Sequence, residues 1–315
     1  MRSIGRREAS VLAAIAALAL VLAAAAPGFF ARDNLGDLFL ANVPVLIAAL
    51  GMTLVILTGH IDISVGSVFA ICAVASGLLA KAGVPMPLVA LGACAIGGLL
   101  GALNGAFVAY LRIPSIVVTL ATMVALRDAL RWTTGGAWVQ ELPVGFQWLG
   151  TTQSVYPVLV AALVIVLQVA ASWGLRNLAA GRAVYATGSS VDAARLAGVR
   201  TSLVTFSVFV AAGAFTGLAA VVNSVRFSQI PSNTGIGLEL NVIAAVVVGG
   251  TLITGGRGTP AGTLLGVVLL GMIGPALTFM GVSPYWERAI QGGIILTAVA
   301  VDAVRPHVMR VRSYA

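Results

Sequence analysis

Charged residues are scarce in this chain. Only 9% of its 315 residues are Asp, Glu, Lys or Arg, whereas soluble domains carry about 25%. Hydrophobic residues make up 59%, and the mean hydropathy is +1.04. A water-soluble fold of this size cannot bury so much apolar surface. The composition therefore excludes an ordinary globular protein and predicts an all-helical integral membrane protein.

Side chains that commonly carry chemistry are also few. Both cysteines, Cys72 and Cys94, lie in apolar segments, which excludes a disulfide framework and gives no metal-binding spacing. Neither histidine, His60 or His307, belongs to a His-Glu-x-x-His arrangement. We therefore expect no metal, no cofactor and no catalytic residues, and a membrane-embedded enzyme has no support.

Lysine occurs once, at Lys81, and the other 17 basic residues are arginines. A phosphate-binding P-loop needs a lysine in the pattern Gly-x-x-x-x-Gly-Lys-Ser/Thr, which the surroundings of Lys81 do not provide. The chain is therefore not expected to hydrolyse ATP by itself. In so apolar a chain, the net charge of +8 is typical of cytoplasmic loops in a membrane protein and not of nucleic-acid binding.

Ten apolar segments approach the roughly 20 residues that a helix needs to cross a bilayer. The second and third are so close that one broken helix is an alternative, and the eighth is short enough to be tilted or re-entrant. The expected spans are 10–26, 40–58, 63–80, 87–110, 114–132, 155–173, 203–225, 239–253, 260–280 and 287–304.

The N-terminus imitates a cleavable signal peptide, because three arginines precede an apolar stretch that ends in Ala24-Ala25-Ala26. We expect the first helix to be retained, since nine further spans need no cleaved leader. If ten spans alternate from a cytoplasmic N-terminus, 12 of the 18 basic residues fall on the cytoplasmic side. Both termini are therefore expected in the cytoplasm.

Glycine is abundant, with 37 residues, and several are spaced four apart. This spacing places small residues on one helix face, where they let helices approach closely in lipid. The pattern predicts one compact transmembrane domain over residues 1–315. The spaced sets are Gly97, Gly101 and Gly105, then Gly213 and Gly217, then Gly262 and Gly266.

A polar segment between the sixth and seventh spans, residues 174–202, predicts a short helix. Ser190 suits the N-cap, Asp192 the first turn, Arg195 the last turn and Gly198 the C′ position. A helix of about two turns is unstable alone in water. It needs a partner surface, which is the chain's own inner ends, another subunit or anionic lipid.

Two further polar segments interrupt the spans. In residues 58–67, Asp62 can cap the following helix with help from Ser64. In residues 249–263, Gly256-x-Gly258-x-x-Ala261 loosely matches a dinucleotide-binding pattern. No strand precedes it and apolar spans flank it, so that interpretation is rejected.

Together the three segments resemble the permease subunit of sugar-type ATP-binding cassette (ABC) importers, the ribose, xylose, rhamnose and autoinducer-2 group. His60 and Ile63 depart from the usual residues of that family. Residues 134–139 and 185–188 look most like rhamnose and autoinducer-2 permeases. The matching residues are Gly59 to Ser67, Gly181-Arg182, Ala186-Thr187-Gly188, Ala193 to Gly198, Glu239-Leu240, Ile243-Ala244-Ala245, Gly249-Gly250-Thr251 and Gly255 to Thr259.

The resemblance implies a multi-pass protein of the bacterial inner membrane. Its partners would be ABC ATPase subunits, a second permease subunit, identical or paralogous, and an extracytoplasmic sugar-binding protein. The short helix would couple to the ATPase through Gly181, Arg182, Gly188, Asp192, Ala193, Ala194, Arg195, Leu196 and Gly198. The residues of the family's motif turns would be Asp62, Ser64, Gly66, Gly255, Gly256 and Gly258.

Polar residues inside spans are costly and usually face a bundle interior or a water path. For some candidates a local role is the alternative: Asp128 and Arg131 are spaced to pair on one helix, and Glu239 and Asn241 lie at a helix start. A neutral sugar needs hydrogen bonds and aromatic faces, not a charged pocket. The translocation candidates are Asn104, Arg127, Asp128, Arg131, Asn223, Arg226, Glu239 and Asn241.

Two other classes of transporter remain as alternatives. A branched-chain amino-acid ABC permease shares the general plan, but the turn at residues 61–67 is of the sugar type. An ion-coupled secondary transporter favours acidic side chains near the middle of the membrane. Here the acids fall at span ends or in loops, with the depth of Asp128 undetermined.

Overall fold

A computed structural model of the chain describes residues 6–283, 285–294 and 296–297, and within these ranges it is helical with no strand. Residues 286–294 and 296–297 are also helical. The named elements are α1 (Arg6–Ala25), η1 (Pro27–Phe30), α2 (Arg32–Leu57), α3 (Val65–Lys81), α4 (Met86–Ala109), α5 (Ser115–Thr134), η2 (Gln147–Gly150), α6 (Tyr156–Asn177), α7 (Ala179–Ser189), α8 (Val191–Leu196), α9 (Thr201–Ser224), α10 (Leu238–Val248) and α11 (Pro260–Phe279).

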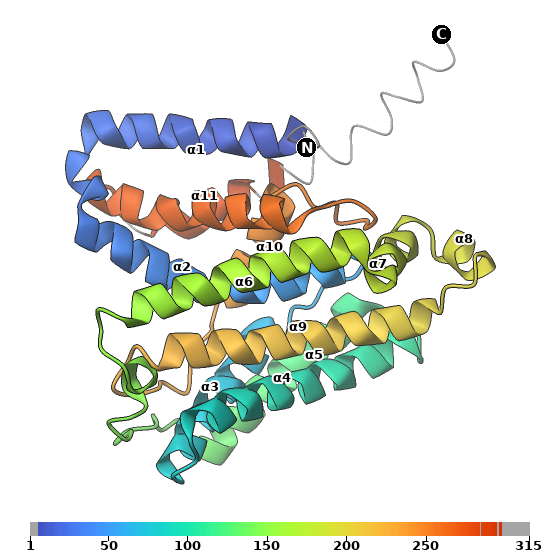
Figure 1. The fold of residues 1–315 in the computed structure, drawn as a ribbon, viewed down its shortest axis with the longest axis horizontal. Helices are drawn as coiled ribbons and strands as arrows, with labels where there is room; N and C mark the ends of the chain where they lie inside the picture. The colour runs from blue at the N-terminus through green and yellow to red at the C-terminus, as the bar shows by residue number, and fades with distance from the viewer. Residues whose placement is uncertain (1–5, 284, 295, 298–315) are drawn as a thin grey trace.

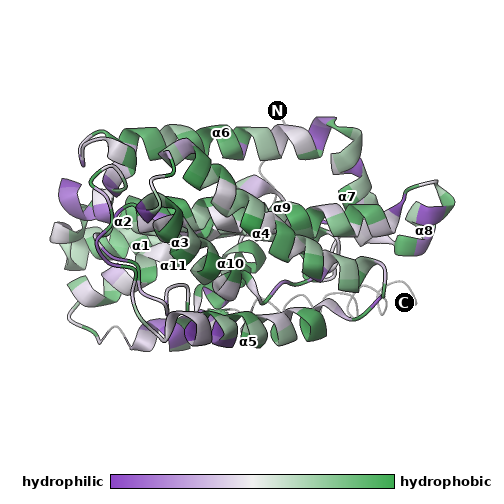
Figure 2. Cartoon of the chain, turned by 90° about the horizontal axis from the view of Figure 1, so that it is seen from below, coloured by the Kyte–Doolittle hydropathy of each residue, from purple (hydrophilic) through white to green (hydrophobic). Residues whose placement is uncertain are grey.

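The long helices lie side by side in one bundle, and α7 and α8 project from one end of it (Figure 1). We call this end the α8 end. The start of α1 lies there too, because the Thr259 hydroxyl before α11 donates a hydrogen bond to the Glu8 carboxylate at 2.6 Å. Hydrophilic residues gather toward the two ends, and the middle of the bundle is mostly apolar (Figure 2).

Six of the helices in the described part of the chain are long and apolar enough to cross a membrane: α1, α2, α4, α6, α9 and α11. Helix α5 has the length but carries three charged residues, Arg127, Asp128 and Arg131. Helix α10 has 11 residues, which span only about 16 Å, about half of the hydrocarbon layer. The tenth expected span, 287–304, lies partly outside the described residues.

The expected spans match the observed helices with some shifted ends. The second begins at Arg32 instead of residue 40, because Asp33 in its first turn favours a helix through the dipole. The second and third are separate helices, divided by residues 58–64. The eighth ends at Val248 instead of residue 253, since Gly249 and Gly250 follow and Gly250 has a φ of +96°.

Helix α7 was not expected, because the sequence predicts only one short helix within residues 174–202. Gly181 and Gly188 both lie inside α7. A Cβ on Gly181 would meet the Leu175 backbone at about 2.5 Å, so the glycine lets α7 fold back tightly against the end of α6.

Helices α4 and α9 touch through their backbones. A Cβ on Gly97 would overlap the Gly213 carbonyl oxygen, and a Cβ on Gly213 would overlap that of Gly97. Gly101 faces the Phe209 carbonyl and Gly217 the Ala93 carbonyl in the same way. The four-residue glycine spacing therefore does what the sequence predicts: it brings two helices into direct contact.

The Gly213→Ala substitution tests this contact. Its Cβ would be forced against the α4 backbone, which cannot move without separating the helices, so we expect a loss of about 1–3 kcal/mol in stability. A lower melting temperature of the purified protein would report it. Gly98→Ala is the matched control, because its Cβ would meet only Val210 and Ala214 at 3.8–3.9 Å. Equal melting temperatures for the two variants would contradict the assignment.

Candidate functional site

Helix α8 is built as the sequence predicts. The Ser190 side chain accepts a hydrogen bond from the backbone N–H of Ala193 at 3.3 Å and so caps the helix. At the other end, Gly198 has a φ of +81°, and its N–H donates to the Arg195 carbonyl at 2.9 Å. Asp192 lies in the first turn and Arg195 in the last.

The outer surface of α8 is open. Of its six residues only Ala194 is buried, and the Leu196 side chain is 91% exposed. The Arg195 guanidinium bends back and donates to the Thr201 hydroxyl at 3.0 Å. An apolar side chain thus stands free beside charged ones at the tip of the molecule.

The three segments that carry the family resemblance meet behind α8. A Cβ on Gly188 would overlap the Leu57 carbonyl oxygen and come within 2.6 Å of the Gly256 nitrogen. The Gly256 N–H also donates to the Leu57 carbonyl at 2.9 Å. Backbone from α7, the end of α2 and the loop before α11 therefore packs together at one point. We call this contact of Leu57, Gly188 and Gly256 the glycine junction.

Neighbouring residues reinforce the glycine junction. The Tyr185 hydroxyl on α7 donates to the Gly258 carbonyl at 2.8 Å. Burial raises the pKa of Tyr185 above its ordinary value. Gly255, with a φ of +86°, lies against the backbone of Gly59. Arg182 donates to the Asn177 carbonyl at 3.1 Å and so caps the end of α6.

The turn before α3 is held from inside the bundle. Asp62 is buried, and one of its oxygens accepts from the Ser64 backbone N–H at 2.9 Å and the Ser64 hydroxyl at 2.6 Å. The Asn104 amide on α4 donates to the Ser64 hydroxyl at 2.8 Å. The expected cap of α3 by Asp62 is wrong: Ser64 occupies the N-cap without a side-chain cap bond, because its hydroxyl is engaged with Asp62 and Asn104.

Arg127 and Glu239 converge on Gly66. A Cβ on Gly66 would overlap the Glu239 carboxylate and lie 3.2 Å from the Arg127 guanidinium. Arg127 donates to the Thr234 carbonyl at 3.1 Å, and Glu239 accepts from the Gly237 N–H at 3.2 Å. The second Glu239 oxygen is buried and has no hydrogen-bond partner among the described residues. Gly66 therefore leaves room for a polar contact between α3, α5 and α10.

The remaining candidates lie apart from one another. Asp128 and Arg131 form an exposed ion pair at 3.7 Å on α5. This is the pairing on one helix that the sequence offers as the alternative to a role in translocation. Arg226 donates to the Leu40 carbonyl at 2.8 Å, and its guanidinium lies 5.6 Å from the centre of the Phe227 ring.

Three cavities lie among the described residues at the ends and side of the bundle. Of the eight translocation candidates, Asn223 and Asn241 line them and the other six do not. One, of about 400 Å³, lies at the α8 end beside His60, Arg112 and Arg195. Another, of about 360 Å³, lies at the opposite end and includes Asn223.

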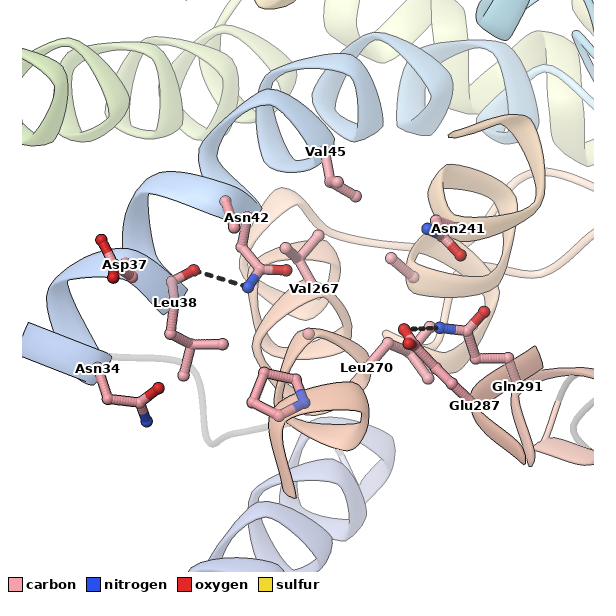
Figure 3. A pocket seen from close by; sticks show the side chains of 14 residues that line it. Asn34, Asp37, Leu38, Asn42, Val45, Asn241, Val267, Leu270, Glu287 and Gln291 are labelled. Atoms are coloured by element: carbon pink, nitrogen blue, oxygen red, sulfur yellow. Dashed lines mark hydrogen bonds between the residues drawn. The ribbon is translucent and has the colours of Figure 1, made fainter. Parts of the chain in front are cut away.

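The third cavity, of about 350 Å³, lies between α2, α10, α11 and the helical residues that follow. Figure 3 shows Asn42, Asn241 and Glu287 around it. The Gln291 amide donates to Glu287 at 3.0 Å, and Asn42 donates to the Leu38 carbonyl at 2.8 Å. Four of its polar side chains therefore already have hydrogen-bond partners within the chain: Asn34, Asn42, Glu287 and Gln291.

Comparison with known proteins identifies the family. The family model described as the branched-chain amino acid transport system / permease component matches residues 34–299. The chain belongs to this family. No solved structure matches the permease.

Several relatives of this permease have the same name, autoinducer 2 import system permease protein LsrC. The protein of that name from Salmonella typhi is 36% identical over 94% of the chain and 85% of its own length. The protein from Enterobacter sp. (strain 638) is 37% identical over 94% of the chain and 86% of its own length. The protein from Escherichia coli (strain K12 / DH10B) is 36% identical over 91% of the chain and 85% of its own length.

Sequence reasoning missed features of the permease that depend on contacts between distant segments. The Asn104–Ser64 hydrogen bond joins residues 40 positions apart, and the Tyr185–Gly258 bond joins residues 73 positions apart. The motifs that contain Ser64, Tyr185 and Gly258 could be recognised in the sequence. Their spacing did not show which atoms of distant segments these residues would contact.

The Asn104→Ala substitution tests the polar contact behind the turn. It removes a buried donor to Ser64, and we expect a loss of about 1–3 kcal/mol, read as a lower melting temperature of the purified permease. Asn177→Ala is the control, because the exposed Asn177 amide bonds only to its own helix at Trp173. A shift no larger for Asn104→Ala than for Asn177→Ala would exclude a stabilising role.

Proposed function

We propose that this permease is the membrane-spanning subunit of an ATP-driven importer that carries a sugar or sugar-like molecule into the bacterial cytoplasm. The observation that carries the proposal is the glycine junction together with the exposed α8. A short helix is held out from the bundle and follows directly on α7, whose backbone contacts the end of α2 and the loop before α11. This arrangement suits a contact that receives force from another subunit.

In this proposal the α8 end faces the cytoplasm. Arginine supports the orientation: Arg176, Arg182, Arg195 and Arg200 all lie in or beside α7 and α8, and basic residues favour the cytoplasmic side. The Glu8–Thr259 hydrogen bond brings the start of α1 to the same end. We propose ten spans with both termini inside, of which α10 crosses only part of the bilayer.

ATP hydrolysis is assigned to separate ABC ATPase subunits that dock on α8. Leu196 supplies an apolar contact, with Asp192 and Arg195 as its polar neighbours. When the ATPase moves α8, the rigid glycine junction passes the displacement to α2 and to the loop before α11. In this way α8 and the glycine junction shift the bundle between two states, one open to the outside and one open to the cytoplasm.

A second permease subunit, identical or paralogous, completes the pathway in this proposal. Helix α5 supports it, because Asp128 and Arg131 are mostly exposed on its surface. Charged groups that face lipid are costly. This face of α5 therefore suits a water-filled path or a partner subunit. An extracytoplasmic binding protein would deliver the substrate at the end opposite α8.

The substrate class follows from the relatives, which are named for autoinducer-2 import. Autoinducer-2 is the first substrate to test, and rhamnose, ribose and xylose are the next. The family description names branched-chain amino acids. Relatives named for autoinducer-2 and a turn of the sugar type make amino-acid transport the less favoured alternative.

Purification from the native membrane in mild detergent, followed by mass spectrometry of the companions, tests the assembly. We expect an ABC ATPase in the complex, and a second permease would show a heterodimer. Repeated recovery of the chain alone, with uptake that collapses with the proton gradient, would favour a secondary transporter instead.

The Leu196→Glu substitution tests docking on α8. A charge in the centre of an apolar contact should lower recovery of the ATPase with the permease about tenfold or more, whereas folding is unaffected because the side chain is exposed. Val144→Glu is the matched control, since Val144 is 95% exposed and lies at the opposite end. Equal ATPase recovery with both variants would refute the docking site.

A further inference from the structure

The cavity at the end opposite α8 has walls of two segments far apart in the sequence. Trp138 follows α5, and residues 223–234 run from the end of α9 into its connection with α10. We call this cavity of about 360 Å³ the Trp138 pocket. Its volume is within the roughly 300–1,000 Å³ typical of small-molecule sites.

The walls of the Trp138 pocket are firmly fixed. Val139 and Ile230 pair as an antiparallel bridge, with two N–H···O bonds of 2.9 Å. The Ser232 hydroxyl donates to the Gly136 carbonyl at 2.9 Å. A Cβ on Gly77 would meet Ile230 at 2.7 Å and Val139 at 3.1 Å, so the bridge packs directly on α3. The backbone that carries the lining side chains is therefore fixed by the Val139–Ile230 bridge and by its packing on α3.

The lining combines aromatic surface with neutral polar groups. Trp138 and Phe227 are each 47% exposed, so both present ring surface that the protein does not cover. Asn223 and Gln229 supply amides, and Ser224 supplies a hydroxyl. Among the lining residues in the described part of the chain none is ionisable.

Ser224 gives a second, independent sign of a ligand. Its side chain is 2% exposed, and its hydroxyl has no hydrogen-bond partner among the described residues. A buried hydroxyl without a partner is unfavourable by about 1–3 kcal/mol. Because the hydroxyl itself has almost no accessible surface, a bound molecule with its own hydroxyl groups would remove that cost once the Ser224 side chain turns toward the pocket.

The pocket also borders the polar contact inside the bundle. The carbonyl of Thr234, another lining residue, accepts from Arg127 at 3.1 Å. Arg127 and Glu239 in turn meet beside Gly66. A molecule in the Trp138 pocket would therefore be separated from Arg127 by one residue, Thr234.

We propose that the Trp138 pocket is the first site in the permease to receive substrate, and that it binds a neutral polyhydroxylated molecule. The rings of Trp138 and Phe227 cover the C–H face of the molecule. Asn223, Ser224 and Gln229 bond to its hydroxyl groups. The inference rests on the proposed function, because it requires this end of the bundle to face the outside.

A fluorescence titration tests binding directly. The full chain in lipid nanodiscs is titrated with autoinducer-2, L-rhamnose, D-ribose and D-xylose, and with D-gluconate as a charged polyhydroxylated control. We expect a saturable change with at least one neutral probe and none with gluconate. Trp138→Phe should abolish the change, and Trp132→Phe should keep it, since Trp132 is exposed on α5 outside the pocket.

Uptake by the complete importer in vesicles tests the role in transport. Trp138→Ala should raise the half-saturating substrate concentration about tenfold, and Asn223→Leu should raise it about fivefold. Phe30→Ala, an exposed aromatic outside the pocket, should behave as wild type.

Three results would overturn the assignment: no saturable signal with any of the four neutral probes, an unchanged signal in Trp138→Phe, or wild-type half-saturation in both pocket variants. If wild-type vesicles import with ATP while the pocket variants are normal, only the pocket assignment fails. If wild-type vesicles import none of the probes with ATP, the proposed function fails and the pocket assignment falls with it.

Discussion

Direct contact between helix backbones at glycine is the constraint on which the rest of the structure depends. In lipid there is little hydrophobic force between helices, so close packing and backbone contact must hold the bundle together. Gly97 and Gly213 bring α4 against α9, and Gly249 and Gly262 bring the end of α10 against α11. Because no side chain separates these surfaces, the helices cannot slide without losing the contact. The bundle is therefore stiff at the contacts of α4 with α9 and of α10 with α11.

The same kind of contact lies behind α8. At the glycine junction, Gly188 lies on the Leu57 carbonyl and beside Gly256. In the proposed function, this backbone-to-backbone contact passes on a displacement of α8 that flexible side chains would absorb. Arg127 and Glu239 lie around the buried Gly66, and the Trp138 pocket borders them at Thr234. The glycine junction at one end and the neutral Trp138 pocket at the other are the two features on which the proposed solute path rests.

Local chemistry was predictable from the sequence, and distant contacts were not. Ser190 and Gly198 define α8 because capping and positive φ depend on neighbouring residues alone. Glycine spacing predicted a close helix face but not the partner helix. Helix α7 was missed, and the close backbone neighbours that account for its glycines, Gly181 and Gly188, are known only from the fold. The Trp138 pocket needs a bridge between residues 139 and 230, which no local pattern encodes.

The central claim is that this permease works as the membrane subunit of an ATP-driven importer. The most direct measurement is uptake of labelled autoinducer-2 into vesicles that contain the permease, its companion ATPase and the binding protein, with ATP or a non-hydrolysable analogue inside. The account predicts uptake that requires hydrolysable ATP and persists when a protonophore collapses the proton gradient. Uptake that ignores ATP and stops with the protonophore would contradict it.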